Sequence, residues 1–230
     1  MRIDVLTLFP EMFPPVLQAS IVGRAVAKGL LQVNVRDLRY WSHDKHRTVD
    51  DRPYGGGPGM VMKPEPFFEA VDDLRRNESS TPWAVLLSPQ GEKFTQKKAE
   101  ELSRRPWVIL LCGHYEGVDE RVREALADEE LSIGDYVLTC GELPAMVVVD
   151  SAVRLLPGSL GDERSTEQES FSDNLLEYPQ YTRPAEYRGY RVPDILLTGD
   201  ESRIATWRKL QAFRRTSQKR PDLSNGPSDS

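Results

Sequence analysis

Two short runs of apolar residues, at positions 83–87 and 108–112, constrain the fold more than any other feature of this chain. Nearly continuous apolar runs of this length are typical of strands that are buried on both faces of a parallel sheet. Between them, residues 95–105 combine lysines and glutamates with a leucine, which suits a surface helix. The order strand, helix, strand predicts an α/β fold with a parallel sheet flanked by helices.

The same patterns extend over the N-terminal two thirds of the chain. We expect strands at 3–9 and 31–38, helices at 14–28, 118–130 and 145–156, and a strand or loop at 133–138. Residues 158–174 are rich in Gly, Ser, Asp and Glu and predict a mobile linker. Beyond it, Asp200 is placed to cap a helix with Ile204, Trp207 and Leu210 on one face, followed by a frayed tail at 221–230. The expected organisation is a main domain over 1–160, a flexible linker over 161–174 and a small helical C-terminal domain over 175–230.

Composition excludes several classes of protein. With 39% hydrophobic and 29% charged residues, the chain has the balance of a soluble globular protein. Its apolar runs fall far short of the roughly 18 residues that span a bilayer, and its first residues lack the apolar stretch of a signal peptide. Two cysteines do not make a disulfide framework. We therefore expect a cytoplasmic protein with no membrane association.

The charge distribution points to a polyanionic partner although the net charge is −6. Residues 203–220 hold seven arginines and lysines and no acid, and residues 36–47 hold a second basic cluster interleaved with Tyr40 and Trp41. One such run is usually a solvated face. Two runs in one chain favour a nucleic acid as the partner.

Two loops rich in glycine follow predicted strands, at 112–117 (Cys-Gly-His-Tyr-Glu-Gly) and at 132–144 (Ser-Ile-Gly-Asp-Tyr-Val-Leu-Thr-Cys-Gly-Glu-Leu-Pro). They expose backbone groups that a flat polar ligand can approach, as in a nucleoside pocket. A further cluster at 55–59 lacks the Gly-Lys-Ser/Thr ending of a phosphate-binding loop, which excludes an NTPase. A tight turn and a nucleotide-contacting loop both remain open for it.

Some residues with reactive side chains have ordinary explanations. The spacing of Cys112, His114 and Cys140 matches no usual zinc pattern and lacks a fourth ligand, so core or backbone-lining roles are favoured. Arg154 is either a cation at a helix C-terminus or a guanidinium aimed at a carbonyl oxygen that gains charge. By composition alone, Glu167 and Glu169 are solubilising acids.

Several motifs in order nevertheless resemble one family. They are Pro53-Tyr-Gly-Gly-Gly-Pro-Gly-Met60, Cys112-Gly-His-Tyr-Glu-Gly117, Ser132-Ile-Gly-Asp-Tyr-Val-Leu138, Gly141-Glu142 and Tyr181-Thr-Arg-Pro184. The chain from Met1 to about Leu223 is similar to the bacterial tRNA (guanine-N1)-methyltransferases of the SPOUT superfamily. Members of that family methylate N1 of the guanosine immediately 3′ of the anticodon, at tRNA position 37.

The resemblance implies a deep trefoil knot formed by residues 86–91, 113–117 and 132–141. It implies S-adenosylmethionine bound in the knot, a homodimer with active sites at the subunit interface, and a dependence on magnesium, with no metal-ligating residue to name. The cofactor-binding residues that it implies are Leu86, Leu87, Ser88, Pro89, Gly113, Tyr115, Glu116, Gly117, Ile133, Gly134, Tyr136, Leu138, Cys140, Gly141, Pro144 and Glu177.

The resemblance also implies roles in catalysis and RNA binding. Glu169 matches the carboxylate that takes the proton from guanine N1, Arg154 matches a guanidinium that stabilises charge on O6, and Glu177 matches an acid that contacts the methionine amino group. The implied tRNA-binding residues are Asp50, Gly55, Gly59, Arg214 and Arg215.

This chain departs from the family pattern at three positions. Glu169 and Glu177 stand where the family has aspartates, and Cys140 stands where it has a glycine. If that glycine requires a positive φ, Cys140 is strained. Two alternatives therefore stay open: a noncatalytic tRNA-binding SPOUT protein, and a SPOUT methyltransferase that acts on ribosomal RNA.

Overall fold

The computed structural model describes residues 1–76, 78–161 and 169–225. The chain divides into two compact units, Met1–Gly161 and Asp162–Ser230. Much of the predicted mobile linker, including Glu167, falls on residues 162–168 and so lies outside the described part of the chain. Each unit is therefore considered by itself.

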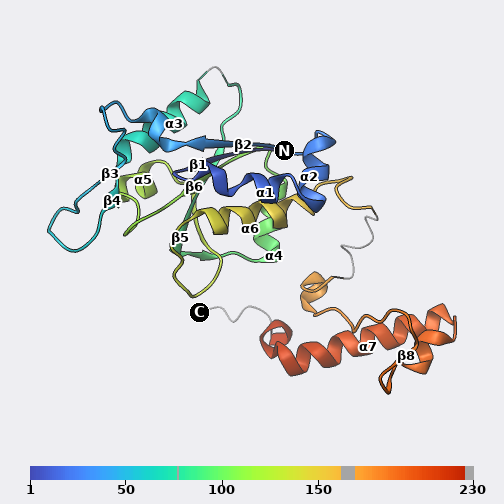
Figure 1. The fold of residues 1–230 in the computed structure, drawn as a ribbon. Helices are drawn as coiled ribbons and strands as arrows, with labels where there is room; N and C mark the ends of the chain where they lie inside the picture. The colour runs from blue at the N-terminus through green and yellow to red at the C-terminus, as the bar shows by residue number, and fades with distance from the viewer. Residues whose placement is uncertain (77, 162–168, 226–230) are drawn as a thin grey trace. The chain divides into compact units, whose positions relative to one another are not determined.

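A parallel sheet forms the centre of the first unit (Figure 1). Its strands are β1 (Arg2–Thr7), β2 (Gln32–Asp37), β5 (Trp83–Lys93), β6 (Trp107–Cys112) and β7 (Glu129–Ser132), in the order β2-β1-β6-β5-β7. All residues of β6 are buried. The parallel sheet predicted from the apolar runs is thus confirmed.

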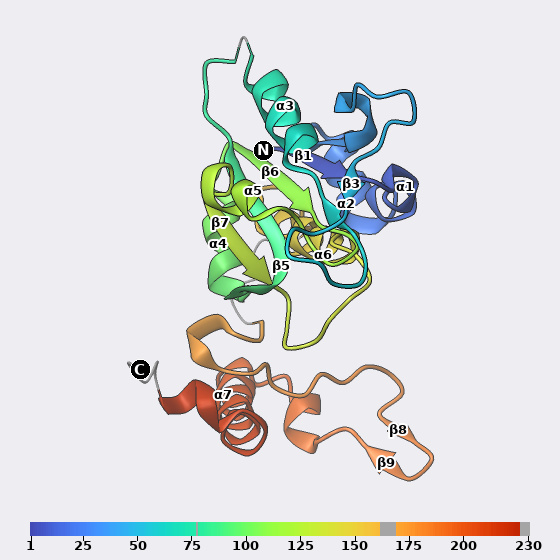
Figure 2. The ribbon, with the colours of Figure 1, turned by 90° about the vertical axis from the view of Figure 1, so that its left-hand side faces the viewer.

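Helices cover both faces of this sheet, as the two views in Figures 1 and 2 show. One face packs on α1 (Pro14–Leu17), α2 (Ser20–Ala27), α4 (Gln96–Ser103) and α6 (Glu142–Val153); the other packs on η2 (Leu38–Trp41), α3 (Pro64–Arg75) and α5 (Glu120–Ala125). Alternate residues of β6 belong to the two hydrophobic cores. Val108 and Leu110 pack in one core, and Ile109 and Leu111 pack in the other. This explains why its sequence is continuously apolar.

Shorter elements complete the first unit. A 3-10 turn, η1 (Pro10–Met12), precedes α1, and the antiparallel pair β3 (Asp50–Asp51) and β4 (Val61–Met62) flanks the Gly55–Gly59 loop. The predicted helix at 14–28 is two helices, and Ser20, the first residue of α2, has a φ of 50°. Residues 133–138 form a loop, one of the two outcomes expected.

The prediction of one helix over 118–130 is wrong at its C-terminal end. The helix α5 ends at Ala125, and Glu129–Ser132 form strand β7 beside β5. The acids that suggest a solvated helix bind the neighbouring strand instead: Asp128 Oδ2 accepts from Ala84 N at 2.8 Å, and Glu129 Oε2 accepts from Trp83 Nε1 at 3.3 Å. Helix α3, over residues 64–75, was not predicted.

The second unit contains η4 (Ser172–Asn174), the hairpin β8 (Glu186–Tyr187) and β9 (Tyr190–Arg191), η5 (Asp194–Leu197), α7 (Glu201–Lys219) and η6 (Pro221–Asn225). The Asp200 carboxylate caps α7 by accepting from Arg203 N at 3.1 Å, as predicted. The prediction of an apolar face on this helix is wrong at Leu210, because the Leu210 side chain is exposed. The buried residues of the helix are Ala212 and Thr216. Of the predicted frayed tail, Pro221–Asn225 form a short 3-10 helix, and residues 226–230 lie outside the described part of the chain. No helix in the described ranges is long and apolar enough to cross a membrane.

A buried carboxylate ties three strands together at one end of the sheet. Asp4 in β1 is fully buried. It accepts from the Arg2 and Arg36 Nε atoms at 2.7 and 3.4 Å, from Trp107 Nε1 at 2.8 Å and from Asn34 Nδ2 at 3.0 Å. Because a buried charge is costly unless its hydrogen bonds are made, this network depends on the carboxylate.

We expect Asp4→Asn to lower the free energy of unfolding by about 2–4 kcal/mol, since the amide turns one acceptor into a donor that faces other donors. Urea unfolding measures the change. Glu78→Gln is the matched control, because Glu78 accepts from the same Arg2 at 2.5 Å but is exposed. A surface pair of that kind contributes about 0–1 kcal/mol. Equal losses in the two variants would contradict the special role of Asp4.

Candidate functional site

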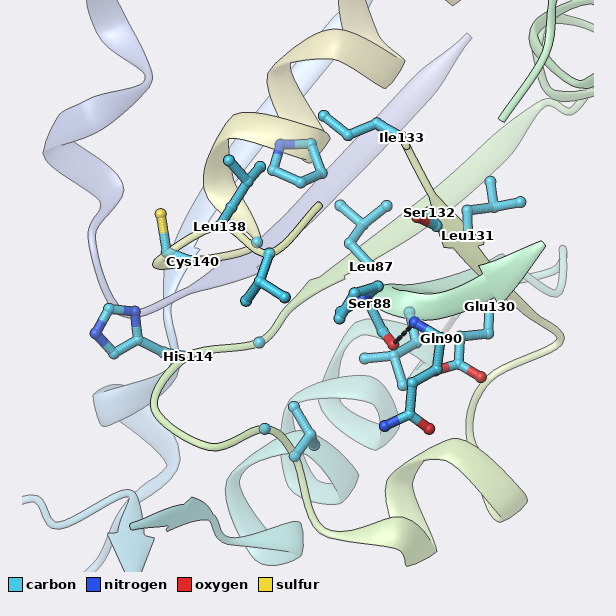
Figure 3. A pocket seen from close by; sticks show the side chains of 18 of the residues that line it. Leu87, Ser88, Gln90, His114, Glu130, Leu131, Ser132, Ile133, Leu138 and Cys140 are labelled. Carbon is cyan, nitrogen blue, oxygen red and sulfur yellow. Dashed lines mark hydrogen bonds between the residues drawn. The ribbon is translucent and has the colours of Figure 1, made fainter. Parts of the chain in front are cut away.

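A cavity of about 220 Å³ opens at the carboxyl ends of the parallel strands, where ligands of α/β proteins bind (Figure 3). Three stretches of chain line it, at 86–90, 113–118 and 130–141, with contributions from Glu120, Arg123 and Pro144. The loops rich in glycine that the sequence singles out therefore meet around one cavity.

Close backbone contacts hold these loops together. Gly141 N donates to Gly113 O at 2.8 Å, and Phe94 N donates to Ser132 O at 2.8 Å. A Cβ atom at position 141 would lie 2.7 Å from Gly113 N and 2.9 Å from Cys112 Cα, closer than real Cβ contacts. The approach of the two loops therefore requires glycine at position 141.

The walls of the cavity combine apolar side chains with backbone groups. Leu87, Ile133 and Leu138 are among the apolar residues around it, and Ser88 Oγ accepts a hydrogen bond from Gln90 N at 2.9 Å (Figure 3). Tyr115 adopts a φ of 59°, an uncommon conformation for a residue that is not glycine. Such strain is often stored at ligand-binding sites.

The Gly55–Gly59 loop is attached to the rim of this cavity. Glu116 N donates to Met60 O at 3.0 Å, and Met62 N donates to Gly117 O at 2.9 Å. Gly59 has a φ of 76° and packs so closely on the Glu116 side chain that a Cβ atom would clash with it. Of the two interpretations left open by the sequence, a plain turn and a ligand-contacting loop, this position is compatible with the second.

A buried acid next to the cavity loop is hydrogen-bonded to the end of β1. Glu142, in the first turn of α6, is fully buried, and its Oε1 accepts from Thr7 Oγ1 at 2.5 Å. Thr7 Oγ1 in turn accepts from Phe9 N at 2.9 Å. The chain of bonds connects the end of β1 to the loop that carries Cys140 and Gly141.

The structure brings fifteen of the predicted cofactor-binding residues to this one cavity. They are Leu86, Leu87, Ser88, Pro89, Gly113, Tyr115, Glu116, Gly117, Ile133, Gly134, Tyr136, Leu138, Cys140, Gly141 and Pro144. Ten further lining residues were not selected: Gln90, His114, Val118, Glu120, Arg123, Glu130, Leu131, Ser132, Val137 and Thr139. His114 and Ser132 lie inside the same motifs, whereas Glu120 and Arg123 belong to α5 and carry no local signal.

The other predicted site residues are not among those that line this cavity. Arg154 follows the last turn of α6 and is half-buried in the first unit. Glu169 and Glu177 belong to the second unit, where Glu177 Oε1 accepts from Gln180 Nε2 at 2.5 Å. Asp50 lies in β3 and pairs with Met62.

Gly55, which has a φ of 83°, and the two arginines of α7 complete the predicted set. Arg214 is exposed, but Arg215 Nη1 donates to Glu177 O at 3.4 Å and is half-buried. Of the two arginines, Arg214 is therefore the more accessible to an RNA phosphate.

The strain expected at Cys140 is absent, because Cys140 is not among the described residues that combine a side chain with a positive φ. Burial raises the pKa of the Cys140 thiol, and a hydrogen bond to the Glu142 carboxylate raises it further. Burial also raises the pKa of Cys112. Across residues 1–76, 78–161 and 169–225, no three His, Cys, Asp or Glu side chains converge as a metal site.

We expect Gly141→Ala to lower the free energy of unfolding by about 1–3 kcal/mol, since its methyl group must displace the backbone of residues 112–113. Urea unfolding is the measurement. Gly161→Ala is the control, because a Cβ atom there meets nothing within 4 Å. Similar stabilities in the two variants would show that the loops can separate at no cost.

We expect Cys140 to react more slowly with iodoacetamide at pH 8 than an unfolded cysteine, because its raised pKa leaves less thiolate. The rate should rise with pH toward that of the unfolded thiol. Glu142→Gln should lower the pKa and speed the reaction, as mass spectrometry of the alkylated peptide would measure. An unchanged pH profile in this variant would exclude Glu142 as a cause.

Comparison with known proteins places the chain in one family. Residues 1–226 match the model of the family described as tRNA (Guanine-1)-methyltransferase TrmD. A tRNA (guanine-N(1)-)-methyltransferase of Halalkalibacterium halodurans is 58% identical over 98% of this chain and 92% of its own length. The enzymes of the same name from Geobacillus kaustophilus and Bacillus subtilis are 58% and 56% identical, each over 97% of this chain and over 91% and 92% of their own lengths. The chain therefore belongs to the tRNA (guanine-1)-methyltransferase TrmD family.

Proposed function

We propose that this protein transfers a methyl group from S-adenosylmethionine to N1 of the guanosine immediately 3′ of the anticodon in tRNA, position 37. The observation that carries the proposal is the cavity at the carboxyl ends of the strands, lined by the glycine motifs of a chain in the TrmD family. The relatives named above are tRNA (guanine-N(1)-)-methyltransferases.

The residues around the cavity fit the cofactor. The loops that are joined by the Gly141–Gly113 hydrogen bond expose backbone groups that can hydrogen-bond the edge of an adenine. Leu87, Ile133 and Leu138 supply apolar surface for the faces of the adenine ring. Bound there, S-adenosylmethionine supplies a methyl group activated by its sulfonium. A magnesium requirement stays a prediction, which chelation of the assay with EDTA tests.

The chemistry at guanine requires a base. Guanine N1 is a poor nucleophile while it carries a proton, so a carboxylate must accept that proton as the methyl group arrives. We assign this role to Glu169. We assign Arg154 to the charge that builds on O6, because a guanidinium stays charged and presents several donors. Glu177 is assigned to the amino group of the methionine moiety.

Asp50, Gly55 and Gly59 are assigned to the RNA near the target base, a role supported by the backbone bonds that fix their loop to the rim of the cavity. Arg214 and Arg215 are assigned to phosphates. Arg214 is the stronger candidate, because Arg215 is partly engaged with the Glu177 carbonyl group.

We further propose the trefoil knot and the homodimer. The backbone bond from Gly141 N to Gly113 O supports the knot, because it joins two of the segments that would thread one another. The dimer rests on the resemblance alone. Light scattering of the purified protein tests it, with about twice the chain mass of 26.1 kDa expected.

The assay that tests the function incubates the protein with labelled S-adenosylmethionine and tRNA transcripts. Transcripts with G 3′ of the anticodon should gain one methyl group, mapped to N1, and transcripts with A there should gain none. Binding of tRNA without any transfer would favour the noncatalytic alternative. Transfer to ribosomal RNA instead of tRNA would favour the second alternative.

We expect Glu169→Gln to slow single-turnover methyl transfer by about 10²–10⁴-fold, because the amide keeps the shape of the side chain but cannot accept a proton. Cofactor affinity should change little, and Glu169→Asp should retain most activity. Quench-flow kinetics with saturating tRNA measures the rate. Normal turnover in the Gln variant, together with loss of activity in Asp173→Asn, would show that the base is assigned to the wrong residue.

A further inference from the structure

A second cavity, of about 390 Å³, lies entirely within the second unit. Residues 178–183 form one wall, Ile204 and Arg208 of α7 form another, and Ala185, Val192, Leu196 and Leu197 complete it. None of these residues is among those that line the cavity of the first unit.

The lining of this cavity favours an anion. It contains two arginines, two tyrosines, a glutamine and a threonine, and no carboxylate. Two acids are adjacent in sequence to lining residues. Glu177 accepts a hydrogen bond from Gln180 Nε2 at 2.5 Å, and Glu186 forms an ion pair with Arg191 at 3.4 Å. The positive charges of Arg183 and Arg208 therefore face the cavity region without an acid among the residues that line it.

Arg208 is the residue that points most strongly to a ligand. Its guanidinium carbon lies over the Tyr178 ring, 4.8 Å from the ring centre, which is a cation–π contact. Its Nε atom is buried, yet no acceptor for it is found among the described residues. A buried donor without an acceptor costs free energy, which a bound acceptor would recover.

We propose that this cavity binds one nucleotide of the RNA substrate, with the phosphate on the Arg208 guanidinium and the base against a tyrosine ring. A guanidinium matches a phosphate with two parallel hydrogen bonds. Aromatic side chains stack on any base. The choice of RNA over a free nucleotide rests on the proposed function, since both offer the same chemistry.

The test compares two Arg–Tyr pairs in the full-length protein. Arg208→Gln removes the proposed contact, and Arg188→Gln is the matched control, because Arg188 lies 5.3 Å from the Tyr187 ring but outside the cavity. Filter binding gives the Kd for a tRNA transcript over a range of salt concentrations. A parallel titration with adenosine monophosphate tests the free nucleotide.

For Arg208→Gln we expect a tRNA Kd about tenfold higher and a slope of log Kd against log salt that is smaller by about one. For Arg188→Gln we expect less than a twofold change. Arg208→Lys should fall between wild type and Arg208→Gln, since it keeps the charge but loses the planar donor pair. Circular dichroism melting checks that each variant is folded.

Equal effects of Arg208→Gln and Arg188→Gln on folded proteins would overturn the proposal, as would a salt slope unchanged by either. Tight binding of adenosine monophosphate that depends on Arg208, with no effect on tRNA, would overturn the choice of RNA. These outcomes are separate from failure of the proposed function, which shows as the absence of methyl transfer by the wild-type protein.

Discussion

The contact between the backbones of residues 112–113 and 141 is the constraint on which the first unit's cavity depends. The 2.8 Å bond from Gly141 N to Gly113 O sets how closely the two loops approach, and a methyl group at 141 would already be too large. Both loops follow strands of the same sheet, so the rigid sheet carries the geometry of the cavity.

Glu142 extends this constraint into the core. A fully buried carboxylate is costly unless it is hydrogen-bonded, and here it accepts from Thr7 at the end of β1 while raising the pKa of the Cys140 thiol. The acid therefore couples β1 to the loop at the cavity. Loss of Thr7 would remove the hydrogen bond that Glu142 Oε1 accepts in the buried core.

The sequence could predict the sheet and the cavity because both rest on local patterns. The five consecutive apolar residues at 108–112 indicate a strand that is buried on both faces of the sheet. The glycines at 113 and 141 indicate that the two loop backbones approach each other closely. Strand β7 could not be predicted, because its Glu129 binds Trp83 and Lys98, which are distant in the sequence. Glu169 likewise has no local feature that separates it from a solubilising acid, so its assignment comes from the resemblance and stays a prediction.

Neighbouring positions in the same loop differ in what they tolerate, and the reason is geometric. The resemblance implies a glycine at position 140, but Cys140 adopts no positive φ, so its side chain costs no backbone strain. Gly141 also has an ordinary φ of −82°, yet it cannot be replaced because the space beyond its Cα is filled by another loop. Of these two neighbouring positions, 141 therefore requires glycine because of packing, whereas 140 accepts a side chain.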